Sequence, residues 1–177
     1  YPQSVTQNTG CSQIVTGPRS VERMNQHNLV SLFMTSRAAS VFAKAVFLCG
    51  KVGKELGFVA EGSDDFCRLM LCTISEEDTT CFRIEFGGAF FDCNSRFPEE
   101  LNQSLKVQPI NQSLKDIGKR NLQEISITVP ENKSWCQFSQ TYAKNSKKLT
   151  SFRFIDSARG EVKEPVTNTE GTKHMVV

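Results

Sequence analysis

A doubled order of expected elements constrains this sequence more than any other feature. Apolar residues recur at helical steps in two stretches, and apolar and polar residues alternate in the stretches after each. The first unit is expected as a strand at 29–34, a helix at 37–51, and strands at 56–61, 66–74 and 79–86. After a loop at 92–104, the second unit is expected as a strand at 107–110, a helix at 112–120, and strands at 125–129, 135–142 and 149–156. We therefore expect an α+β fold with a doubled β-α-β-β-β unit and two helices on one face of an antiparallel sheet.

The expected core follows from the same periods. The apolar face of the first helix is predicted around Val41, Ala45, Leu48 and Val52, flanked by Phe42, Val46 and Cys49. In the strands, one apolar phase is predicted to be buried: Phe82, Ile84, Phe86, Ile125, Ile127, Phe138, Phe152 and Phe154. Pro109 assigns the strand at 107–110 to a sheet edge, because proline cannot donate a ladder hydrogen bond.

The 177 residues suit a single domain with flanking segments. Residues 1–28 are polar and are expected to form a flexible N-terminal arm. Residues 29–156 are expected to form a single domain with repeat units of about 29–91 and 105–156, and residues 157–177 a polar tail or linker. No run of 18 apolar residues occurs, so no membrane span is predicted.

The cysteines leave two cellular settings open. Seven cysteines and Asn-x-Ser sequons at Asn102, Asn111 and Asn132 suit a secreted domain with disulfides and glycans. Most of the cysteines, however, fall among apolar residues of expected strands and helices, where they pack as small hydrophobic residues. That placement favours reduced thiols. The chain has no Cys-x-x-Cys pair and only two histidines, which argues against a structural zinc site.

A catalytic site is hard to assemble from this sequence. Neither His27 nor His174 falls within the expected core, so a Ser-His or Cys-His pair has no obvious base. No Walker loop and no Gly-x-Gly-x-x-Gly motif is present. We therefore expect a protein that is not an enzyme and needs no metal or other cofactor.

The basic residues form the strongest candidate site. Arg37, Lys44 and Lys51 are seven residues apart, which puts them on one face of the first expected helix. The net charge is only +2, so DNA binding would depend on this local arrangement. Such rows neutralise phosphates without reading bases, although an ordinary solvated helix face is the alternative. The candidate DNA-binding residues are Arg37, Lys44, Lys51, Lys54, Lys115, Lys119 and Arg120.

Three stretches resemble a known family. They are Val-Phe-Leu-Cys-Gly-Lys-Val-Gly-Lys-Glu-Leu at 46–56, Ser-Glu-Glu-Asp-Thr-Thr-Cys-Phe-Arg-Ile-Glu-Phe at 75–86, and Ala-Phe-Phe at 89–91. Together they resemble the first domain of the Rad-nine-type subunit of the checkpoint sliding clamp, the nine-one-one complex, within the PCNA-like clamp superfamily. The arm of 28 residues before the first strand departs from that family, as does the presence of a single clamp domain.

The resemblance implies a nuclear, non-catalytic subunit of a heterotrimeric ring in DNA-damage checkpoint signalling, DNA repair and the cell cycle. The implied partners are the other clamp subunits, a clamp loader, double-stranded DNA, and checkpoint and repair proteins, with no membrane. The basic helices would face the DNA channel. Two alternatives stay open: a secreted, disulfide-bonded and glycosylated β-rich recognition domain, and an intracellular α+β protein-interaction module.

Overall fold

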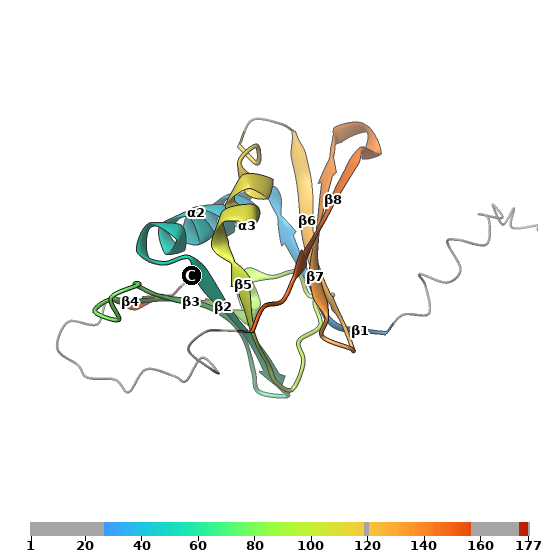
Figure 1. The fold of residues 1–177 in the computed structure, drawn as a ribbon. Helices are drawn as coiled ribbons and strands as arrows, with labels where there is room; N and C mark the ends of the chain where they lie inside the picture. The colour runs from blue at the N-terminus through green and yellow to red at the C-terminus, as the bar shows by residue number, and fades with distance from the viewer. Residues whose placement is uncertain (1–26, 119–120, 157–173, 177) are drawn as a thin grey trace, which may run out of the picture.

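The computed structural model describes residues 27–118, 121–156 and 174–176, and its fold is α+β (Figure 1). This confirms the predicted fold class, with the strands divided between two sheets. The elements in chain order are β1 (Asn28–Thr35), α2 (Ser36–Val52), β2 (Glu55–Ser63), β3 (Phe66–Ile74), β4 (Cys81–Gly87), the 3-10 turn η1 (Gly88–Phe90), β5 (Leu101–Lys106), α3 (Val107–Leu114), β6 (Leu122–Pro130), β7 (Trp135–Tyr142), the 3-10 turn η2 (Ala143–Asn145), β8 (Lys147–Arg153) and β9 (His174–Val176).

The two units exchange their first strands. One sheet has the order β1-β6-β7-β8, and the other has the order β5-β2-β3-β4-β9. The first strand of each unit therefore pairs with the second strand of the other, β1 with β6 and β5 with β2. These pairings are antiparallel, whereas β9 lies parallel to β4. Because each sheet contains strands from both halves of the sequence, neither half can complete its sheet alone.

The core lies between the sheets and the two helices, which lie side by side (Figure 1). Phe42 of α2 is 1% exposed and contacts Phe86 of β4 and Phe138 of β7, with ring centroids 5.7 Å and 6.0 Å away. A single aromatic ring thus joins α2 to both sheets. Burying a phenylalanine in such a setting contributes about 3–5 kcal/mol to stability.

The predicted strand phases agree well with the observed burial. Six of the eight expected core residues are buried: Ile84, Phe86, Ile125, Ile127, Phe138 and Phe152. Phe82 and Phe154 are only partly buried, although they pack against the same core.

The opposite face of β4 is less exposed to solvent than the alternation of apolar and polar residues in this strand indicates. Arg83 donates a hydrogen bond to Glu85, and Arg68 of β3 bridges Glu85 and Glu61 of β2. The Arg68 and Arg83 side chains are each only 16% exposed. An ion-paired network across three strands therefore covers much of this face.

The start of the second unit was predicted wrongly. The expected strand at 107–110 is the first half of α3, the expected loop at 92–104 contains the start of β5, and the helix ends at Leu114, well before residue 120. Pro109 stands in the first helical turn, where a backbone N–H has no helical partner and proline's fixed φ suits the helix. The division into arm, domain and tail stays a prediction, since residues 1–26 and 157–173 lie outside the described residues.

Two glycines allow the elements around the end of α2 to approach closely. A Cβ on Gly50 would lie 2.6 Å from Asn111 Nδ2 and 2.9 Å from Val107 Cγ1, so α3 packs directly on this point of α2. Gly53 donates its N–H to Cys49 O at 3.0 Å, and a Cβ there would overlap the carbonyl oxygen of Ile74. In the described ranges, no helix is long and apolar enough to cross a membrane.

Candidate nucleic-acid interface

The outward side of α2 carries a row of basic side chains. The helix is capped by Thr35, whose hydroxyl accepts a hydrogen bond from the N–H of Ala38. Arg37, Lys44 and Lys51 are all exposed, as their seven-residue spacing predicts. The helix contains no Asp or Glu over its 17 residues. The row therefore has no compensating acid within its own helix, which is the arrangement a polyanion would need.

Apolar side chains are interleaved with this row, which corrects the predicted apolar face of α2. Val41 and Leu48, expected inside, are 36% and 41% exposed, and Phe47 is 53% exposed. The buried residues of α2 are Ala39, Phe42, Ala45, Val46 and Cys49. Ala45 was predicted on the apolar face, whereas Phe42, Val46 and Cys49 were expected only to flank it. We define the α2 outer face as Arg37, Val41, Lys44, Phe47, Leu48 and Lys51.

One pair of side chains on the α2 outer face joins a basic group to an apolar one. The Lys51 ammonium nitrogen lies 4.9 Å from the centroid of the Phe47 ring. This is a cation–π contact between neighbours on successive helical turns. The sequence interpretation missed Phe47 as a surface residue, although its spacing of four from Lys51 was visible.

The other candidate residues differ in their surroundings. Lys54 is exposed and forms an ion pair with Glu76, whose hydrogen bond raises the pKa of the lysine. Its charge is thus already paired within the chain. Lys115 is exposed at the C-cap of α3, where a cation also interacts favourably with the helix dipole. Lys119 and Arg120 lie outside the described residues.

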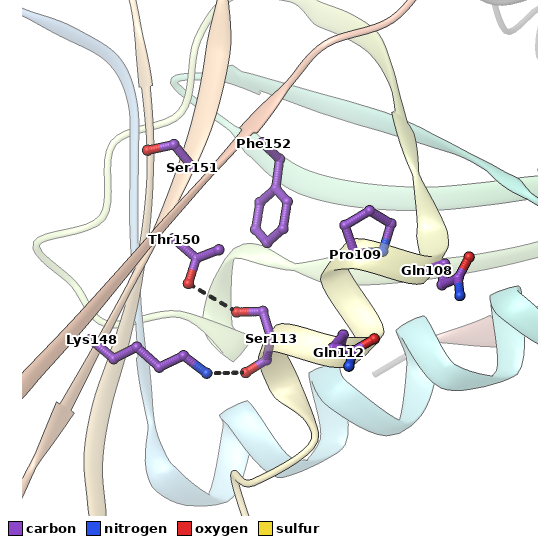
Figure 2. Close-up of a pocket in the computed structure, with 8 residues that line it drawn as sticks. All are labelled: Gln108, Pro109, Gln112, Ser113, Lys148, Thr150, Ser151 and Phe152. Carbon is purple, nitrogen blue, oxygen red and sulfur yellow. Dashed lines mark hydrogen bonds between the residues drawn. The ribbon is translucent and has the colours of Figure 1, made fainter.

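A polar network anchors the C-terminal end of α3 against β7 and β8, and Figure 2 shows the part of it made by Ser113, Lys148 and Thr150. The buried Gln140 donates to the carbonyl oxygen of Ser113 at 3.0 Å, and Lys148 donates to the same oxygen at 3.2 Å. Tyr142 donates its hydroxyl proton to Gln140 Oε1 at 2.5 Å, and Ser113 Oγ donates to Thr150 Oγ1 at 3.2 Å. The network satisfies the Ser113 carbonyl, one of those that a helix end leaves without a helical partner.

A pocket of about 550 Å³ opens beside this network. Figure 2 shows the Phe152 ring between the strand and Pro109 of α3, with Lys148 turned towards the helix carbonyl. The residues around the pocket are Gln108, Pro109, Gln112, Ser113, Lys148, Thr150, Ser151 and Phe152. They include no Asp, Glu, His or Cys, so the pocket has neither a carboxylate nor an imidazole for acid–base chemistry.

The cysteines of the described ranges are free thiols, and three of them are deeply buried. Burial raises the pKa of Cys49 and of Cys72 to about 12, and it raises the pKa of Cys136 as well. We call these three the buried thiols. A thiol held protonated in this way is a poor nucleophile. Cys11 lies outside the described residues, and in the described ranges no cluster of His, Cys, Asp or Glu could hold a metal ion.

The sheet edges are covered unequally. The outer edge of β1 bonds to Arg96, that of β5 bonds to Ile155, and β9 covers β4. Among the residues that the structure describes, no segment pairs with the outer edge of β8. The exposed side chains of β8 include Leu149, which is 51% exposed. An uncovered edge strand of this kind is a template for adding a further strand.

Comparison with solved structures identifies the fold. The chain is similar to a chain of the PCNA2–PCNA3 complex from Sulfolobus tokodaii, with a TM-score of 0.55 and 12% identity, covering 86% of this chain and 53% of that one. It is also similar to PF-8, the DNA polymerase accessory subunit of Kaposi's sarcoma-associated herpesvirus, with a TM-score of 0.50 and 10% identity, covering 78% and 48% of the two chains.

The chain therefore has the fold of a PCNA-like sliding clamp, and it spans about half the length of these structures. At these identities the likeness concerns the fold alone. No protein-family model matches the sequence, and no curated protein matches it.

Proposed function

We propose that this chain is a non-catalytic subunit, or part of a subunit, of a DNA sliding clamp or processivity factor, with α2 facing double-stranded DNA. The observation that carries the proposal is the exposed, acid-free row Arg37, Lys44 and Lys51 on a helix of a PCNA-like fold. The row lies on the side of α2 that the core does not use.

The physical argument concerns phosphates. Long basic side chains at seven-residue steps repeat about every 10.5 Å along a helix, which lets them meet several phosphates of a backbone. Such contacts release condensed counterions and carry no sequence information, as a protein that moves along DNA requires. Lys115 would add a further contact from α3, whereas the pairing of Lys54 with Glu76 makes Lys54 the weakest candidate.

Salt dependence of DNA binding tests the proposal. Binding of a labelled 30-base-pair duplex is measured by anisotropy between about 30 and 200 mM salt for the protein and for the Arg37→Glu/Lys44→Glu/Lys51→Glu variant. Loss of three phosphate contacts should reduce the slope of log K against log salt by about 2.7, at about 0.9 per contact.

A matched control reverses three exposed charges in the loop before β5 and on β8, Arg96→Glu/Lys147→Glu/Arg153→Glu, with the same change in net charge. This control should lower the affinity for the duplex slightly through long-range electrostatics, and it should retain most of the slope of log K against log salt. Equal slopes for the two variants would mean that α2 is an ordinary solvated helix and would remove the basis of the proposal.

We also propose how the chain meets its partners in a ring. The uncovered edge of β8 is the place where a strand of another clamp subunit would add, extending the sheet across the interface. Leu149 stands exposed on that strand. Leu149→Lys should therefore weaken association with partner clamp subunits in sedimentation experiments while leaving the unfolding midpoint of the chain unchanged.

The finer proposal is a Rad-nine-type subunit of a nuclear, heterotrimeric checkpoint clamp that serves repair and cell-cycle signalling. The resemblance at 46–56, 75–86 and 89–91 supports it; these stretches correspond to the end of α2, the β3–β4 connection with β4, and η1. Reconstitution with the other two subunits and the matching clamp loader tests it. Failure to enter that ring, with duplex binding retained, would favour a processivity factor of another type.

A further inference from the structure

The α2 outer face combines two kinds of side chain that duplex binding alone does not require. Phosphate contact explains Arg37, Lys44 and Lys51. It does not explain Val41, Phe47 and Leu48, which stand between them at 36%, 53% and 41% exposure. Large apolar side chains grouped on one exposed face usually mark an interaction site.

The charge of this face restricts its occupant to an anionic one. The helix carries three cations and no acid, so an acidic or polyanionic partner is favoured over a neutral or basic one. The apolar side chains require that the same partner also presents flat or apolar surface. Single-stranded nucleic acid has both properties, since its bases are free to stack and its backbone is charged.

Phe47 and Lys51 place the two complementary groups together. The ring is half exposed, and the ammonium nitrogen lies 4.9 Å from its centroid. A base that stacks on the ring therefore brings its own phosphate close to a cation held by the next turn of the helix. Bases within a duplex are already stacked on each other and cannot use the ring in this way.

We propose that Phe47, with Lys51, is a stacking site for an unpaired base, so that the α2 outer face prefers DNA containing a single-stranded segment, such as a primer–template junction. This inference rests on the proposed function, because it assumes that α2 meets DNA. It adds a base-stacking contact to a surface otherwise built for phosphates.

The test compares two probes, a labelled 20-mer of dT and a 20-base-pair duplex, on the full chain at low salt. Phe47→Ala should weaken binding of the dT 20-mer about ten-fold and that of the duplex less than two-fold. Phe66→Ala, which removes an exposed ring on β3 and outside the α2 outer face, should change both less than two-fold. Phe47→Trp should retain binding, and its indole emission should be quenched by the dT 20-mer.

The outcomes separate this inference from the proposed function. If the charge-reversal variant loses duplex binding while Phe47→Ala binds the dT 20-mer normally, the stacking site is wrong and the phosphate-binding face stands. If the protein binds neither probe, both proposals fail. If Phe47→Ala instead abolishes self-association of the chain and leaves both DNA affinities unchanged, the face binds a second copy, and the stacking site is refuted.

Discussion

Two phenylalanines of the same helix should differ sharply in what they contribute to stability. Phe42 is 1% exposed and contacts a ring in each sheet, whereas Phe47 is 53% exposed and its ring lies under the Lys51 ammonium group. The changes Phe42→Ala and Phe47→Ala remove the same atoms from neighbouring turns. They also gain the same helix propensity, about 0.5 kcal/mol. The difference between the two losses in free energy of unfolding therefore isolates the effect of burial.

The expected magnitudes follow from these surroundings. Phe42→Ala should lower the free energy of unfolding by about 4–5 kcal/mol, near the top of the range for buried phenylalanine, because two aromatic contacts are lost together with the buried area. Phe47→Ala should cost less than about 0.5 kcal/mol, since loss of an exposed cation–π contact, about 0.5–1 kcal/mol, is offset by the gain in helix propensity.

Urea unfolding followed by the fluorescence of Trp135, the sole tryptophan, measures both values. With a slope of about 2 kcal/mol per molar urea, Phe42→Ala should move the midpoint down by about 2 M. Phe42→Leu provides an intermediate variant if the alanine variant is too unstable to study. A cost below about 2 kcal/mol for Phe42→Ala, or equal costs for the two alanine variants, would refute the placement of α2 between the sheets.

Three further predictions concern close packing, the polar network and the thiols. Gly53→Ala should cost about 1–3 kcal/mol in urea unfolding because its methyl group meets a backbone carbonyl, whereas Gly87→Ala, with open space around it, should change stability little; equal effects would contradict the packing. Gln140→Ala should cost about 1–3 kcal/mol because it removes the buried amide that accepts from the Tyr142 hydroxyl and donates to the Ser113 carbonyl, and a neutral result would show that the network is dispensable. The buried thiols keep their protons in the folded state, while the unfolded chain releases them above pH 9. Their contribution to the free energy of unfolding is therefore intact below pH 9 and is lost progressively as the pH rises above it. Stability should therefore be about 4 kcal/mol lower at pH 10 than at pH 8, and the decrease should be smaller when Cys49 and Cys136 are replaced by alanine.

The strands were predictable because their signal is local. In β4, β6 and β7 a large apolar residue alternates with a polar one, and only one phase can face a core. Ile84, Phe86, Ile127 and Phe138 are accordingly buried. The doubled order of elements was visible for the same reason, since each element carries its own period.

Pairing between distant strands was not predictable in this way. Nothing within residues 28–35 specifies that β1 pairs with β6 across nearly a hundred residues, because hydrogen bonding between strands uses the backbone that every residue shares. The error at the start of the second unit was different in kind. Pro109 was taken as evidence of an edge strand, although proline is equally at home in the first turn of a helix.

The side of α2 that faces the core could have been derived from the charged residues of the helix. Apolar residues occur nearly all around this helix, so periodicity alone does not decide which arc is buried. Arg37, Lys44 and Lys51 decide it, because an unpaired charge cannot be buried without a large desolvation cost. Val41 and Leu48 lie between them at the same seven-residue spacing and must therefore be exposed, as they are. Since both side chains are exposed, core packing does not account for them, whereas the DNA contact that we propose for the α2 outer face does.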